Sequence, residues 1–343
     1  MESKSTYGGH LPVLLNRSPN RKMHIEMLIS IIPLHYCWSC IALGGFTFLV
    51  SLFILLTFDR SLEHIELFFA LSVLLSWENM MIIWAHNKIK NFKNTLINII
   101  ELPEEEIFKH YDDQEEVIFN DKRMIAAGLI VIAAVHILGI DQHGLPFHSF
   151  QANLLFNGVY YADSYIVGVG LYIMIMAALA VHSIGYFPLH VNILLSQNIQ
   201  AIGVLYSKFT ILAASVYVIW GVFHIMTPPG FSSSQMVLWF ASFAILLIAY
   251  FILPQYSIHQ MMTNTKKDKL EIFSSSLRKI AEETFKDPTD DHVLHLKYML
   301  RIQRQLDEMN EWPFSFYEIL HIATIIVIPL VVLTLEMIYN ILR

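Results

Sequence analysis

Long apolar runs, uninterrupted by lysine, arginine, aspartate or glutamate, recur along this chain of 343 residues and leave few folds open to it; the first extends from Met27 to Phe58. With 55% hydrophobic and 15% charged residues and a mean hydropathy of +0.51, the composition is that of an integral membrane protein. A helix needs about 20 apolar residues to cross a bilayer. We therefore predict an all-α, multi-pass membrane protein with seven transmembrane helices, at residues 36–58, 65–86, 124–141, 160–183, 209–226, 236–254 and 319–341. The uncharged stretch 184–207 leaves room for an additional interfacial or re-entrant segment.

The distribution of basic residues predicts the orientation of these helices. Cytoplasmic segments of membrane proteins are enriched in lysine and arginine. With a cytoplasmic N-terminus, all of the 22 basic residues except Arg60 and Arg343 lie in segments on the cytoplasmic side. The sequence thus predicts an external C-terminus and the plasma membrane as the location.

The chain divides into four parts by composition. We expect a cytoplasmic N-terminal segment at 1–35, transmembrane helices 1 to 6 within 36–254, and a charged cytoplasmic helical segment at 255–317 that is interrupted at Asp287-Pro288. The last helix then occupies 318–343. An apolar stripe within the cytoplasmic segment is explained either by packing within one chain or by a seam between subunits.

Ionisable side chains inside the apolar runs are the first candidates for a functional site, because a charge at membrane depth is costly. We single out the intramembrane polar residues Glu78, His136, Asp141 and Asp163. Aromatic and methionine side chains near them suggest a ligand pocket, although such residues more often serve ordinary packing; the pocket candidates are Trp77, Met81, Tyr161, Tyr165 and Tyr172.

The last predicted helix carries a repeat of four residues that would suit a pore. Thr324, Ile328, Val332 and Glu336 lie on one face of this helix. If several subunits met here, the apolar residues would form a dewetting gate and the carboxylates a ring that attracts cations. The simpler explanation of Glu336 is a helix-end carboxylate at the level of the lipid headgroups.

Sequence motifs give little support to an enzyme. Histidines and an aspartate near the predicted third and fourth helices resemble metal ligands in type, but the His boxes of membrane di-iron enzymes and the H-E-x-x-H motif are absent. The net charge of −7 argues against a nucleic-acid partner. We therefore expect no enzyme activity, no metal and no cofactor, with a membrane metal enzyme as the remaining alternative.

The layout resembles the insect odorant and gustatory receptor superfamily of seven-transmembrane ion channels. The shared features are the seven helices, their orientation, short external loops, and a long cytoplasmic helical segment that leads into a final helix at the C-terminus. The resemblance implies a tetramer that packs through cytoplasmic helices and lines a cation pore with its last helix. This chain lacks the family's T-Y and Q-F pairs, since Ile325 follows Thr324, so individual pore residues do not transfer.

These observations predict a homotetrameric, ligand-gated cation channel in the lipid bilayer, assembled through residues 290–341 and opened by an unknown small molecule. One alternative is a monomeric or dimeric proton-coupled carrier that uses the intramembrane acids and histidines. Another is a membrane sensor or scaffold that conducts nothing.

Overall fold

The computed structural model describes residues 23–32, 34–62, 64–97, 100, 102–137, 147–184, 198–226, 233–286, 289–308 and 312. Within these residues the chain forms helices and no β-strand, which confirms the all-α class. The helices are α1 (His24–Ile29), α2 (Tyr36–Ile54) with its continuation η1 (Leu55–Asp59), α3 (Ile65–Ile97), α4 (Glu104–Ile118), α5 (Asp121–Ile137), α6 (Phe150–Ile184), α7 (Asn198–Met226), α8 (Ser233–Lys286) and α9 (Asp290–Asp307).

Four helical segments are long and apolar enough to cross a membrane: Tyr36–Asp59, Ile65–Lys93, Phe150–Ser183 and Ile202–Gly221. They correspond to the first, second, fourth and fifth predicted spans, and they confirm the membrane class. The third predicted span coincides largely with α5, the sixth lies in the first part of α8, and the seventh falls outside the described residues.

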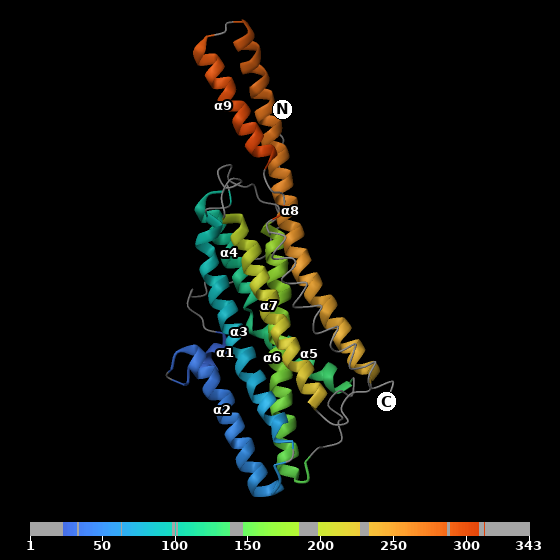
Figure 1. The fold of residues 1–343 in the computed structure, drawn as a ribbon. Helices are drawn as coiled ribbons and strands as arrows, with labels where there is room; N and C mark the ends of the chain where they lie inside the picture. The colour runs from blue at the N-terminus through green and yellow to red at the C-terminus, as the bar shows by residue number, and fades with distance from the viewer. Residues whose placement is uncertain are drawn as a thin grey trace.

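The helices pack as an elongated bundle in which α3 is central (Figure 1). It contacts α2, α6 and α7, while α8 runs along α6 and α7. Helices α2 and α3 approach closely at Gly44, where the absence of a side chain leaves room: an added Cβ atom would lie 2.3 Å from the carbonyl oxygen of Ser72. Only 17% of the apolar window of Tyr36–Asp59 is buried, so most of the apolar surface of α2 is exposed in the described structure.

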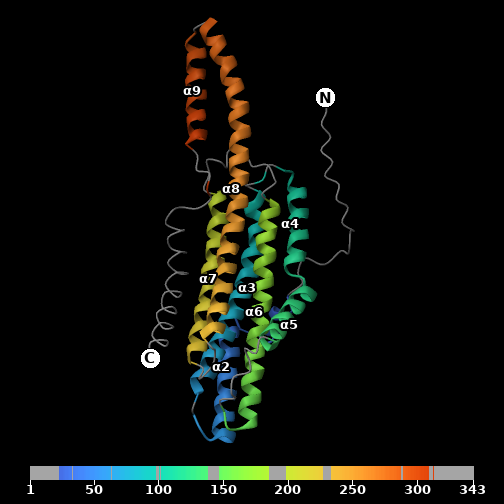
Figure 2. The same ribbon diagram turned by 90° about the vertical axis from the view of Figure 1, so that its right-hand side faces the viewer.

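Helix α8 continues well beyond the bundle. It passes Pro254 without ending, so the predicted boundary at residue 254 lies inside one helix. Helix α8 ends at Lys286 and α9 begins at Asp290, so the predicted interruption at 287–288 lies between them. Both views show the two helices as a hairpin that projects from the bundle (Figures 1 and 2). The Nζ atom of Lys266 donates a hydrogen bond to the backbone oxygen of Asp307 at 2.9 Å, near the base of this hairpin.

Helix α4 is fastened to the end of α3 by a buried tyrosine. The Tyr111 hydroxyl donates a hydrogen bond to the backbone oxygen of Ile89. Burial raises the pKa of Tyr111, and the nearby carboxylates of Glu115 and Asp112 raise it further. The hydroxyl therefore stays protonated and remains a donor at physiological pH.

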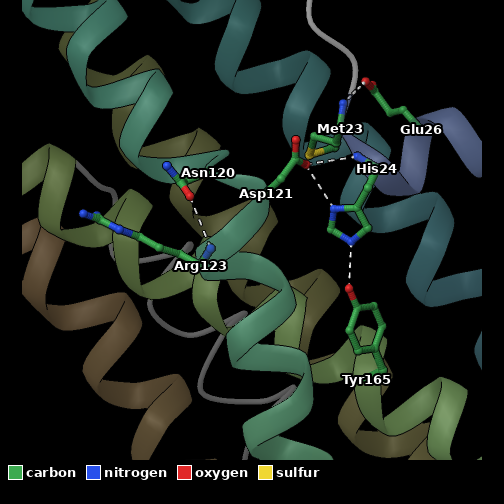
Figure 3. A network of polar contacts seen from close by, with 7 residues as sticks. All are labelled: Met23, His24, Glu26, Asn120, Asp121, Arg123 and Tyr165. Atoms are coloured by element: carbon green, nitrogen blue, oxygen red, sulfur yellow. Dashed lines mark hydrogen bonds and ion pairs between the residues drawn. The ribbon is translucent and has the colours of Figure 1, made fainter. Parts of the chain in front are cut away.

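The short helix α1 is held against the bundle by a network of polar contacts (Figure 3). The Asp121 carboxylate on α5 lies 3.1 Å from Nδ1 of His24, whose Nε2 atom lies 2.9 Å from the Tyr165 hydroxyl on α6. On α3, Nδ1 of His86 lies 2.8 Å from the Glu26 carboxylate. Three helices of the bundle thus hold α1 in place.

The ion pair of Glu26 with His86 predicts a pH-dependent contribution to stability. Burial alone would raise the pKa of Glu26, but the hydrogen bond and charge of His86, the Met23 amide and the charge of Lys90 together lower it. A carboxyl with a lowered pKa in the folded state stabilises the protein above its unfolded pKa, and this stabilisation is lost as the pH falls through the folded value. We expect Glu26→Gln to cost roughly 1–3 kcal/mol at pH 7 and progressively less below about pH 4.5.

Thermal unfolding of purified protein between pH 3.5 and 8 measures this effect. Glu283→Gln is the control, because Glu283 is an exposed acid on α8. A Glu26→Gln penalty that does not change with pH would contradict the electrostatic explanation.

Candidate functional site

A largely apolar cavity of about 100 Å³ lies between α3, α6 and α7, with one residue contributed by α8. One acidic residue, Glu78, lies in its wall. No lysine, arginine or histidine of the described residues lines it. The aromatic lining residues are Trp84, Phe209, Tyr217, Trp220 and Tyr250.

Glu78 is the polar centre of this cavity. Its side chain is only 4% exposed, and its Oε1 atom accepts a hydrogen bond of 2.9 Å from the Trp220 indole on α7. Its Oε2 atom has no hydrogen-bond partner among the described residues. A buried polar atom is normally satisfied, so Oε2, which is enclosed by protein, is an unsatisfied acceptor on a residue that lines the cavity.

A second buried carboxyl group, Asp163 on α6, is not among the lining residues of the cavity but is near enough to Glu78 for their charges to interact. Asp163 is fully buried, and neither of its carboxyl oxygens has a hydrogen-bond partner within the described part of the chain. Two ionised carboxylates at this depth would repel each other and lack solvation. The pair therefore needs a proton or a cation to balance its charge.

Neighbouring residues fix the position of Glu78 on α3. The Asn79 side chain donates a hydrogen bond of 2.7 Å to the backbone oxygen of Leu75, one turn earlier. The Trp77 indole donates a hydrogen bond of 2.7 Å to Oγ of Ser215 on α7. With the Trp220 contact, two indole groups join α3 to α7, so the acid is held in a rigid frame.

The structure separates the predicted ligand-pocket residues. Met81 lines the cavity, whereas Trp77, Tyr161, Tyr165 and Tyr172 are not among its lining residues. Tyr165 contacts His24, and Tyr172 donates a hydrogen bond of 2.6 Å to the backbone oxygen of Val117. Tyr161 packs beside Tyr160, with ring centroids 6.2 Å apart. These three tyrosines therefore join helices or fill the core.

The predicted polar set is brought together in part. Glu78 and Asp163 interact, but His136 is exposed on α5, away from the buried interior. Asp141 lies outside the described residues, as do the pore candidates Thr324, Ile328, Val332 and Glu336. In the described part of the chain, no group of three or more histidine, cysteine, aspartate or glutamate residues is placed to hold a metal ion.

The cavity's aromatic wall contains residues that the sequence did not single out as a site. Phe209, Tyr217 and Trp220 come from α7, and Tyr250 comes from α8. The three residues of α7 follow one another at intervals close to whole helical turns, which places them on one helical face. That spacing was the available signal, although it equally predicts ordinary core packing.

Comparison with protein-family models, with curated proteins and with solved structures gives no match. Function in such a chain is best inferred from the chemistry of the site, since one fold serves many functions. The candidate site is a cavity with aromatic walls and one acidic lining residue, Glu78, whose charge interacts with that of the buried Asp163.

Proposed function

We propose that the chain is the subunit of a homotetrameric cation channel of the plasma membrane, opened by a small molecule that binds in the cavity between α3, α6 and α7. The proposal includes seven membrane-spanning helices with a cytoplasmic N-terminus and an external C-terminus. The lining of apolar and aromatic residues around a single free acceptor is typical of small-molecule sites.

The observation that carries this proposal is the course of α8. Tyr250 of α8 forms part of the cavity wall, and the same helix then continues without interruption to Lys286. The hairpin partner α9 ends at Asp307, shortly before the last apolar run. A rigid helix of this kind can transmit a change at the cavity to the last helix, because a ligand shifts an equilibrium between two conformations by binding them differently.

The proposed pore lies at the end of that path. Thr324, Ile328, Val332 and Glu336 would face the symmetry axis of a tetramer that assembles through residues 290–341. Four copies of Glu336 would concentrate cations at the external mouth. The apolar side chains of Ile328 and Val332 would close the pore by excluding water from it.

Potassium flux into liposomes, combined with the subunit number in nanodiscs by native mass spectrometry, tests the proposal. Benzene is a suitable first probe, since an apolar protein cavity of about 150 Å³ admits it. We expect a tetramer, a potassium flux that benzene increases, and a several-fold lower flux with loss of selectivity over chloride in Glu336→Gln.

Two glycines of α6 provide matched controls for the effect of benzene. A Cβ at Gly170 meets no atom within 4 Å, and Gly170 lines the cavity, so leucine there fills the space. Gly158 is equally unobstructed but is exposed and does not line the cavity. Benzene should act on Gly158→Leu and not on Gly170→Leu. An equal response of both variants would assign the effect to the bilayer and contradict the proposal.

The buried acidic pair favours a second candidate, a proton-coupled carrier. Asp163 is fully buried beside Glu78, an arrangement suited to taking up and releasing a proton. A stable monomer or dimer with substrate uptake driven by a pH gradient would support this carrier over the channel. Ligand binding without any flux would instead indicate a sensor.

A further inference from the structure

We propose that the natural ligand of the cavity is a small organic ammonium ion whose cationic group is held by Glu78 and the surrounding aromatic rings. This inference rests on the proposed function in one respect, namely that the cavity is the ligand site. It adds the chemical class of the ligand.

The buried acids at this site favour a ligand with a positive charge. Oε2 of Glu78 and both carboxyl oxygens of Asp163 lack hydrogen-bond partners among the described residues, and both side chains are at least nine-tenths buried. No basic side chain of the described residues lines the cavity to balance them. A ligand with an N–H donor and a positive charge would satisfy the unpaired oxygen of Glu78 and balance the charge of that carboxylate, and a charge-assisted hydrogen bond is the strong kind.

The aromatic walls of the cavity also favour a cation. Trp84, Phe209, Tyr217, Trp220 and Tyr250 surround the same space. The face of an aromatic ring attracts a cation within about 6 Å of its centroid, and the attraction is stronger where water is excluded. An acid beside several aromatic rings is therefore a better match to an ammonium group than to an anion or a plain hydrocarbon.

The groups around Glu78 indicate how such a ligand would be oriented in the cavity. The Trp220 indole donates a hydrogen bond to Oε1 of Glu78. The second oxygen, Oε2, is therefore the one that would accept a hydrogen bond from the ligand. Apolar residues such as Met81, Ile166 and Leu212 complete the lining and suit the hydrocarbon part of an amine. The volume of about 100 Å³ limits the ligand to a small molecule unless the walls move.

The test compares cyclopentylamine, which is cationic at pH 7, with cyclopentanol, its neutral counterpart of nearly the same shape. Binding to full-length protein in nanodiscs is followed by saturation-transfer NMR and by thermal shift. We expect the amine to bind at least about tenfold more tightly than the alcohol, as one charged hydrogen bond in a buried site requires. Glu78→Gln should remove this preference and leave cyclopentanol binding within about twofold.

The outcomes separate this inference from the proposed function. If cyclopentanol and benzene bind and Gly170→Leu blocks them, but the amine binds no better, the cavity remains the ligand site and the ammonium class is wrong. If none of the three binds to the wild-type protein, the proposed ligand site itself fails. Even if Glu78→Gln does not fold, comparing amine with alcohol binding in the wild-type protein decides whether the cavity prefers an ammonium ion.

Discussion

Replacing Gly168 with leucine is expected to prevent the helices from assembling into the native bundle. A Cβ at this position would lie 2.7 Å from the Ala127 carbonyl oxygen and 2.7 Å from the Cα atom of Gly128. Both obstacles belong to the backbone of α5, so no side-chain rotation relieves the clash. Small residues allow membrane helices to approach this closely. Overpacking against a backbone should cost about 3 kcal/mol or more.

The matched control for this substitution lies on the same helix. A Cβ added at Gly158 would meet no atom within 4 Å, and the position is exposed, so leucine there changes the helix-forming tendency equally without a clash. Size-exclusion chromatography and thermal unfolding in detergent should show aggregated or strongly destabilised Gly168→Leu beside normal Gly158→Leu. Equal behaviour of the two variants would show that α5 and α6 do not pack as closely as the structure places them.

The close contact of α5 with α6 at Gly168 also matters for α1. It brings Asp121 of α5 and Tyr165 of α6 to the two sides of His24 (Figure 3). A wider spacing of α5 and α6 would separate these partners. We therefore expect Gly168→Leu to release α1 as well as to weaken the bundle.

The sequence predicted the existence of these helices better than their ends. The apolar runs predicted four helices that are long and apolar enough to cross a membrane, because such a helix must match the length of the hydrocarbon core. They did not show that α6 begins at Phe150 or that α7 begins at Asn198, both well before the predicted spans. Polar residues such as Asn153, Asn157 and Gln200 interrupt the apolar runs before the predicted spans, but the backbone hydrogen bonds that continue a helix do not depend on side-chain polarity.

The candidate site was predictable only in part, and the reason is distance along the chain. Glu78 and Asp163 stood out individually, since each is an acid in an apolar run. Their electrostatic interaction and the contact of Glu78 with Trp220 depend on which faces of α3, α6 and α7 meet. No local pattern encodes that choice. The partners of α1 were missed for the same reason, because His24 and Asp121 are joined only by the tertiary fold.

The second large effect is expected at Asp163, where substitution should stabilise the protein while impairing its activity. Both carboxyl oxygens are buried without a hydrogen-bond partner among the described residues. Leaving a buried polar group unsatisfied costs roughly 1–3 kcal/mol. Asp163→Leu removes this cost and the repulsion from Glu78. The melting temperature should therefore rise by a few degrees.

An acid that destabilises the fold needs a functional reason to be there, since sites built for function commonly reduce stability. Asp163→Leu should thus weaken the response of potassium flux to cyclopentylamine even though the protein melts at a higher temperature. Asp268→Asn, at an exposed position on α8, should change neither the melting temperature nor the flux response to cyclopentylamine. A lower melting temperature for Asp163→Leu would mean that the carboxyl group has a structural partner, and unchanged ligand responses would remove Asp163 from the site. A higher melting temperature together with a lost response would show that Asp163 acts on ligand binding through its interaction with Glu78 rather than as part of the scaffold.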